Sequence, residues 1–296
     1  MGPYVHPTGS WVWSQPWLRW PLLALAVPYG AVVRTRLHLY ARGWLRRTTL
    51  PCRVISVGNL TVGGTGKTPL VIALASWMQA RGERVGVLSR GYGRRSRSAS
   101  VLVSDGRRVL AGPEEAGDEP QVIARRCPGV VVAVGADRAR LGRWVLGQFP
   151  LSCLILDDGF QHLALQRDVD LLVIDASDPR GLADLLPAGR LREPLEGAAR
   201  ASAVILTRAD DPVDVKSVLA ALREAIGKEP APITVSFFAE NLVDPVTGAE
   251  EPAERLSGRH IVAFSGIGNP SGFRQTLVNS GARLLAERVF HDHHVY

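Results

Sequence analysis

A glycine-rich segment at 58–69, GNLTVGGTGKTP, follows a short apolar run and leads into a helical pattern that begins at Lys67. Strand, glycine-rich loop and helix in this order are the context in which a phosphate-binding loop works. Glycines let backbone N–H groups approach phosphate oxygens, and the helix N-terminus adds positive potential. The segment therefore predicts an α/β fold with an anion site where the helix begins.

The second half of this segment carries the residues that bind nucleotide. The usual pattern GxxxxGK[ST] has its first glycine at position 61, where this chain has Thr61. Lys67 would supply charge to the β- and γ-phosphates, and the Thr68 hydroxyl can ligate Mg²⁺. Only three of the 35 basic residues are lysines, which favours a functional Lys67 over a chance lysine in a turn. The predicted ATP-binding residues are Gly63, Gly64, Thr65, Gly66, Lys67 and Thr68.

An acidic element is expected at the end of a neighbouring strand. The apolar run 153–156 is followed by Asp157 and Asp158. Ligands of open α/β sheets bind at the carboxyl ends of the strands, so the run would deliver two carboxylates to that edge. We predict that Asp157 and Asp158 hold Mg²⁺ together with Thr68, with turn-forming or capping aspartates as the alternative.

From residue 53 onward, apolar runs rich in β-branched residues alternate with helical patterns. The runs are continuously apolar, which is typical of a parallel sheet covered on both faces. The predicted fold is α/β, with a P-loop NTPase-like, mostly parallel sheet and helices on both faces. The predicted strands are 53–57, 84–89, 130–134, 153–157, 170–175, 203–207, 233–237 and 260–265. The predicted helices are 67–80, 119–125, 138–147, 213–226 and 271–280.

Three parts are predicted along the chain. Residues 1–48 form an N-terminal membrane-interface helical segment, and residues 49–210 form the P-loop core. A stretch rich in proline and acidic residues near 210–214 marks the start of a smaller C-terminal α/β lobe, 211–296.

The three cysteines are widely spaced without a CxxC pair, so we expect buried thiols and a reducing compartment.

The N-terminal segment predicts an anionic surface as partner. The net charge is +7, and nine basic residues precede the first acidic one, Glu83. The apolar run 20–33 is shorter than the roughly 20 residues that a bilayer-spanning helix needs. We expect an interfacial helix whose Trp17 and Trp20 enter the lipid headgroups, with a core-packing helix as the alternative. Nucleic acid is disfavoured because no known nucleic-acid-binding module occurs.

Six ordered blocks carry a resemblance to a known family. They are GNLTVGGTGKTP (58–69), SRGYG (89–93), GDEP (117–120), DDGFQH (157–162), LLPAGRLREP (185–194) and FHDHH (290–294). In these blocks the chain resembles the tetraacyldisaccharide 4′-kinase family of lipid A biosynthesis. The resemblance implies MgATP-dependent phosphorylation of the 4′-hydroxyl of a tetraacylated glucosamine disaccharide 1-phosphate, which gives lipid IVA. It also implies a peripheral or monotopic place on the cytoplasmic face of the inner membrane of a Gram-negative-type bacterium.

The resemblance assigns the acid–base chemistry to two residues. Asp118 resembles the family's general base, and His293 resembles the partner that orients it. A helix N-cap is the alternative for Asp118. A solvated histidine cluster is the alternative for His293, and a His/Asp metal site is a third interpretation.

Five further positions are candidates for this site. Glu193 would join the Mg²⁺ ligands directly or through water. Arg192, with Arg190, would neutralise phosphate charge. Arg90 and Tyr92 would contact the phosphate and sugar of the substrate. A surface loop with arginines is the alternative for Arg190 and Arg192, and a tight turn is the alternative for Arg90 and Tyr92.

Two other functions are weighed against the kinase. One is a regulatory GGxGKT-type NTPase of the partitioning or metal-insertion class, because TRAD at 207–210 faintly mimics the TKxD guanine reader. The other is a membrane adaptor with a vestigial loop, which the retained Lys67 and Asp157 disfavour. No feature indicates a protein partner. Family members usually continue beyond the last block with a helix and a strand, so the smaller lobe is expected to be incomplete.

Overall fold

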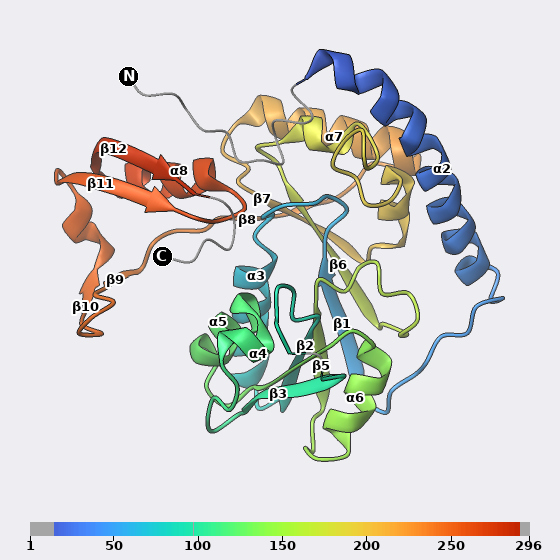
Figure 1. Cartoon of the computed structure of the whole chain (residues 1–296), viewed down its shortest axis with the longest axis horizontal. Helices are drawn as coiled ribbons and strands as arrows, with labels where there is room; N and C mark the ends of the chain where they lie inside the picture. Colours follow the sequence, from blue (N-terminus) through green and yellow to red (C-terminus); the bar gives the residue numbers. More distant parts are fainter. Residues whose placement is uncertain (1–14, 97, 291–296) are drawn as a thin grey trace.

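The computed structural model describes residues 15–96 and 98–290, and its main lobe is built on one eight-stranded sheet (Figure 1). Across the sheet the strand order is β3-β4-β2-β5-β1-β6-β7-β8. β3 runs antiparallel to β4, and the other neighbours are parallel. The strands are β1 (Arg53–Gly58), β2 (Val85–Ser89), β3 (Ser100–Asp105), β4 (Val131–Gly135), β5 (Cys153–Asp157), β6 (Val169–Asp175), β7 (Ala203–Thr207) and β8 (Ile233–Val235).

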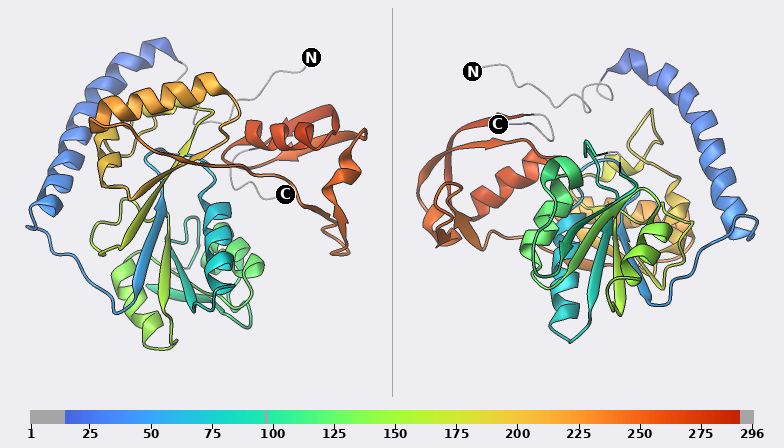
Figure 2. Two further views of the ribbon diagram at one scale, coloured as in Figure 1. Left: turned by 180° about the vertical axis from the view of Figure 1, so that it is seen from behind. Right: turned by 60° about the horizontal axis from the view of Figure 1, so that its bottom comes forward.

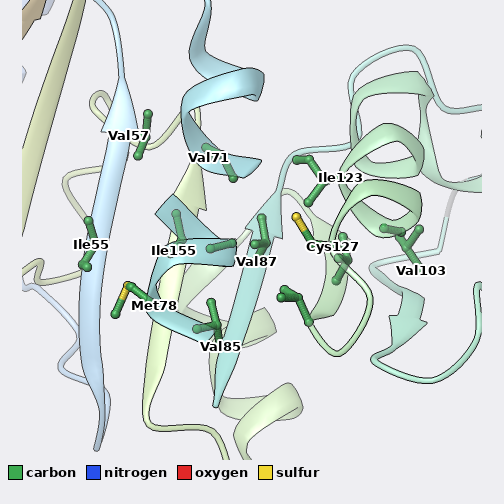
Figure 3. Close-up of a cluster of buried hydrophobic side chains, with 14 of the residues drawn as sticks. Ile55, Val57, Val71, Met78, Val85, Val87, Val103, Ile123, Cys127 and Ile155 are labelled. Carbon is green, nitrogen blue, oxygen red and sulfur yellow. The ribbon is translucent and has the colours of Figure 1, made fainter. Parts of the chain in front are cut away.

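Helices cover both faces of this sheet. On one face, α3 (Lys67–Gln79) and α5 (Asp118–Arg126) bury apolar side chains against alternate residues of the central strands (Figure 3). On the other face, α6 (Arg138–Leu146) and α7 (Pro212–Ile226) cover the remaining strand residues. Because both faces are buried, the strands must be apolar at successive positions. The predicted α/β class with a mostly parallel, two-sided sheet is confirmed.

The element bounds follow the apolar patterns closely where the strands are central. The strands predicted at 153–157, 203–207 and 260–265 are observed with these bounds. β3 was not predicted, because it is a half-buried edge strand in which serine and aspartate interrupt the apolar residues. The described part of the main lobe also contains one short helix and two 3₁₀ segments. They are α4 (Pro113–Ala116), η1 (Pro179–Leu182) and η2 (Leu195–Arg200).

The C-terminal part forms a separate small lobe. The strands β9 (Asn241–Val243) and β10 (Glu250–Pro252) pair antiparallel, and the 3₁₀ segment η3 (Ala253–Leu256) follows. The strands β11 (His260–Ser265) and β12 (Arg283–Val289) pair in parallel and are joined by α8 (Pro270–Asn279). The predicted boundary at residue 210 is too early, because β8 pairs with β7 and α7 packs on the large sheet. We therefore place the lobe boundary after Val235.

The helix α2 (Pro16–Ala41) lies along the side of the main lobe opposite the small lobe, as all views in Figures 1 and 2 show. One of its faces packs on the protein through residues such as Ala26 and Gly30. The other face exposes large apolar side chains, with Trp20 78% exposed and Val27 71% exposed. The packed face agrees with the core-packing alternative, and the exposed face leaves the interfacial role of the helix a prediction. Among the described residues, no helix has the length and apolarity needed to cross a bilayer.

We expect Gly58→Ala to destabilise the fold. A Cβ at Gly58, the last residue of β1, would lie 2.6 Å from both the backbone nitrogen and the Cβ of the fully buried Phe160. Overpacking of this kind costs about 1–3 kcal/mol, and a backbone atom cannot move aside as a side-chain end can. The free energy of unfolding, measured in denaturant, should fall by at least that amount.

Gly147→Ala is the matched control, because Gly147 ends α6 at φ −72° and its Cβ would touch nothing closer than 3.5 Å. It should be neutral or slightly stabilising. Equal stability of the two variants would contradict the close packing of β1 against the segment that follows β5.

Candidate active site

The glycine-rich loop joins the central strand β1 to α3, and neighbouring side chains fix its carbonyl groups. Arg190 donates from Nε and Nη2 to the Val62 carbonyl at 3.1 and 2.8 Å. Arg208 Nη1 donates to the Gly64 carbonyl at 3.1 Å, and Thr207 Oγ1 donates to the Thr65 carbonyl at 3.0 Å. Three peptide units of the loop are thus attached to the protein through their carbonyl oxygen atoms.

The carbonyl contacts also fix the direction of the N–H groups in the same peptide units. The C=O and N–H of a planar peptide unit point in opposite directions. The N–H groups of Gly63, Thr65 and Gly66 therefore point away from the side chains that hold the carbonyls, and these three residues line a cleft. Gly66 is the N-cap of α3 at φ +84°, a conformation that favours glycine. The loop and the helix N-terminus together form a phosphate cradle.

Lys67 and Asp158 form the charged centre beside this cradle. Lys67 Nζ lies 3.7 Å from Asp158 Oδ1, and Arg192 Nη1 lies 2.7 Å from Asp158 Oδ2. Asp158 follows β5 at φ +52°, a rare conformation for a residue other than glycine. In this conformation its side chain faces Lys67, the first residue of α3. Burial acts to raise the pKa of Asp158, but Lys67 and Arg192 favour the charged form and the net shift is downward. Asp158 is therefore a fixed anion that orients two cations.

Asp157 has the opposite electrostatic character. Its side chain is fully buried and accepts a hydrogen bond from Ser89 Oγ at 3.0 Å. Burial, followed by the negative charges of Glu119 and Asp158, raises the pKa of Asp157 to about 7. Two adjacent carboxylates with diverging pKa values are typical of a functional site. A buried carboxylate of this kind is well suited to binding a cation.

Glu193 is also buried, 2% exposed, and is fixed by two donors. Its Oε1 accepts from Gln161 Nε2 at 2.8 Å and from Arg200 Nη2 at 2.6 Å. Glu193 and Thr68 both line the cleft. The described residues hold no group of three or more acidic, histidine or cysteine side chains arranged as a metal site. A Mg²⁺ ion here would need phosphate oxygens or water to complete its coordination, as is usual for this ion.

Asp118 lies where the cleft meets α5. It is the first residue of α5, and the N-cap is Gly117, so the alternative that Asp118 caps the helix is wrong. A Cβ at Gly117 would lie 2.6 Å from the Tyr92 carbonyl, and one at Gly91 would lie 2.8 Å from the Ala116 carbonyl. The two glycines thus let the loops carrying Tyr92 and Asp118 pack together.

The structure places the remaining predicted residues in different settings. Arg90 and Tyr92 line the cleft near Asp118, and Tyr92 is 70% exposed. Arg192 faces Asp158, whereas Arg190 holds the loop backbone and pairs with Asp178. His293, with His291 and His294, lies outside the described residues.

The cleft has a volume of about 2030 Å³, above the roughly 300–1,000 Å³ of ordinary small-molecule sites. The phosphate loop, the start of α5, α2 and the small lobe all border it. It has room for a nucleotide and a second, larger molecule.

Sequence reasoning missed several residues of this cleft. Asn269, the N-cap of α8, donates to Asp175 Oδ2 at 3.1 Å, and Asp175 also pairs with Arg208. These contacts bring the small lobe against the phosphate loop. Tyr29 and Arg36 of α2 reach the same cleft. Glycines flanking the loops were visible in the sequence, but a contact such as that between Asn269 and Asp175, which are 94 positions apart, carried no local signal.

A family model described as tetraacyldisaccharide-1-P 4′-kinase matches residues 18–296. The tetraacyldisaccharide 4′-kinase of Anaeromyxobacter sp. (strain Fw109-5) is 44% identical over 276 residues, which are 93% of this chain and 74% of the relative. That of Pelobacter propionicus is 42% identical over 279 residues, 93% of this chain and 75% of the relative. The crystal structure of LpxK from Aquifex aeolicus in complex with ATP is similar with a TM-score of 0.76 and 37% identity, covering 94% of this chain and 83% of that one.

We expect His162, at the end of the segment that carries Asp157 and Asp158, to make the fold acid-sensitive. Burial, followed by the positive charge of Arg138, lowers its pKa from 6.5 to about 4. Below pH 6.5 the unfolded chain therefore binds a proton that the folded chain does not, and stability falls until about pH 4. Discounted for the partly exposed ring, the loss is about 2 kcal/mol.

Denaturant unfolding between pH 7 and pH 4 measures this loss in the wild type and in His162→Gln. The variant should lose less stability over this interval, because glutamine does not titrate. Parallel pH profiles for the two proteins would show that His162 takes up its proton equally well in the folded state.

Proposed function

Because the chain belongs to the tetraacyldisaccharide-1-P 4′-kinase family, we propose that it transfers the γ-phosphoryl group of ATP to the 4′-hydroxyl of a tetraacylated glucosamine disaccharide 1-phosphate. The product is the lipid A precursor lipid IVA. The observation that carries the proposal is the Lys67–Asp158–Arg192 charge cluster beside the phosphate cradle, in a cleft that α2 also borders. Family membership favours this lipid kinase over a regulatory GGxGKT-type NTPase.

ATP would bind with its phosphates on the residues from Gly63 to Thr68. The LpxK structure from Aquifex aeolicus, which is a complex with ATP, supports the choice of nucleotide. The N–H groups of the loop and the Lys67 ammonium meet the β- and γ-phosphates. Arg192, held by Asp158, faces the same place and would counter the charge that spreads over the transferring group.

Thr68, Asp157 and Asp158 are the proposed Mg²⁺ ligands, and Glu193 would join them directly or through water. Asp157 has a raised pKa because a buried carboxylate lies among other negative charges, and a hard cation would relieve that repulsion. When bound, Mg²⁺ neutralises phosphate charge. The protein residues align the acceptor and accept its proton.

Asp118 is the general base for the acceptor. As the hydroxyl oxygen bonds to the γ-phosphorus and the bond to the ADP oxygen breaks, the hydroxyl proton moves to the Asp118 carboxylate. His293 is proposed to orient that carboxylate. Arg90 and Tyr92, which border the cleft beside Asp118, would hold the phosphate and sugar of the lipid.

The lipid acceptor is reached from a membrane surface. The exposed apolar face of α2 would enter the headgroup region while the arginines that follow it meet anionic lipids. We propose that the protein lies on the cytoplasmic face of the inner membrane of a Gram-negative-type bacterium, as a peripheral or monotopic protein. No nucleic acid or protein partner is proposed.

The direct test is transfer of labelled γ-phosphate from ATP to the disaccharide 1-phosphate in detergent micelles. Wild-type protein should label the lipid, and Lys67→Ala should lower turnover strongly because the charge on the transferring group is lost. Lys216→Ala is the control, since Lys216 lies exposed on α7. Near-normal labelling by folded Lys67→Ala protein would refute the assignment of the phosphate loop.

We expect Asp118→Asn to reduce turnover by about 10²–10⁴-fold, because asparagine keeps the shape but cannot accept the proton. MgATP binding and thermal stability should stay near those of the wild type, since Gly117 and not Asp118 caps α5. Glu114→Gln is the matched control, because its ion pair with Arg95 lies on the exposed surface. A loss below tenfold would return Asp118 to a structural role.

Vesicle binding should depend on the exposed face of α2. Trp20→Ser combined with Leu25→Ser removes two exposed apolar side chains and should weaken binding to phosphatidylglycerol vesicles by at least about tenfold. Trp77→Ser is the control, since Trp77 is exposed on α3. Binding should also weaken as salt rises. Equal binding by both variants would contradict the interfacial role of α2.

A further inference from the structure

The helix α2 is bonded directly to the segment that carries Arg192. Tyr29 Oη donates a hydrogen bond of 2.6 Å to the Arg192 carbonyl, which joins residues 163 positions apart. Two turns further along the helix, Arg36 Nη2 donates to the Gln161 carbonyl at 3.0 Å. The helix thus contacts the two loops that carry Arg192 and Asp158, through their backbones.

The loop that carries Arg192 is held from two sides. The Arg192 N–H donates to the Leu60 carbonyl at 2.7 Å, which ties it to the segment that follows β1. Its carbonyl faces α2 and accepts the Tyr29 bond. The helix comes close enough that a Cβ at Gly30 would lie 2.9 Å from Leu185 Cδ1 of the same loop. The backbone position of Arg192 is therefore set jointly by β1 and by α2.

The position of Arg192 in turn sets the charge cluster. Its Nη1 lies 2.7 Å from Asp158 Oδ2, and Asp158 faces Lys67 Nζ at 3.7 Å. The contacts form one series from Tyr29 through Arg192 and Asp158 to Lys67. Burial raises the pKa of Tyr29, so the phenol keeps its proton and remains a donor at neutral pH.

We propose that Tyr29 is a positioning residue that fixes Arg192 for phosphoryl transfer, so that the helix facing the lipid also sets the turnover of the site. This rests on the proposed lipid kinase function. Tyr29 acts through a backbone carbonyl rather than on the reacting atoms. Its loss should therefore misplace Arg192 in the transition state and lower kcat, with little change in the KM for either substrate.

The test is Tyr29→Phe, which keeps the ring packing and removes the donor. Its kcat should fall about three- to tenfold, the effect expected for one hydrogen bond. Thr35→Val is the matched control, because the Thr35 hydroxyl donates only to the Ala31 carbonyl within α2 in the described contacts. Its kcat should equal that of the wild type. Thermal unfolding and vesicle binding of both variants establish that fold and membrane contact are intact.

A double-mutant cycle with Arg192→Ala separates positioning from a general structural effect. In the Arg192→Ala background, Tyr29→Phe should change kcat less than twofold. The proposal is overturned if Tyr29→Phe has the kcat of the wild type, lowers kcat equally in both backgrounds, or changes only the KM for the lipid. Failure of the wild type to label the lipid would instead refute the proposed function.

Discussion

Binding an anion through backbone N–H groups requires that the carbonyls of the same loop be satisfied elsewhere. An unpaired carbonyl turned toward the cleft would repel phosphate, and one buried without a donor would cost free energy. Here Arg190, Arg208 and Thr207 supply those donors to the loop. In the strand order, β7 lies two strands from β1. Thr207 at the end of β7, and Arg208 after it, contact carbonyl groups of the loop. The side chains that hold the loop in place thus do so through its carbonyl oxygen atoms.

The two aspartates after β5 show how one chain segment can give neighbouring carboxylates different properties. Asp157 ends the strand inside the sheet, where burial disfavours its charge. Asp158 turns at φ +52° toward Lys67 and Arg192, which stabilise its charge. The backbone conformation is unfavourable for a residue with a side chain, and the ion pairs compensate for it. The charged form of Asp157 is therefore disfavoured, whereas Asp158 is a fixed anion that orients two cations.

The sequence alone predicted the parts of the fold that depend on local pattern. Central strands such as β5 and β7 are continuously apolar because both faces are covered, and their bounds were found directly. The lobe boundary was misplaced because α7 and β8 return to the large sheet after a polar stretch that looks like a linker. TRAD at 207–210 suggested a guanine reader, whereas Arg208 binds the Gly64 carbonyl. Its role depends on a partner 144 positions away, which no local pattern encodes.

The two faces of α2 solve a geometric problem that any kinase of a lipid alcohol must meet. The phosphoryl donor comes from water, whereas the acceptor is anchored by acyl chains, so the site needs a fixed distance from the lipid surface. A helix rises about 1.5 Å per residue, which puts Trp20 about 14 Å along the axis from Tyr29. Trp20 is exposed and Tyr29 borders the cleft. In the proposed membrane-bound arrangement, α2 would set that distance. Because α2 is also bonded to the loop of Arg192, it would hold the charge cluster at a fixed position relative to the lipid surface.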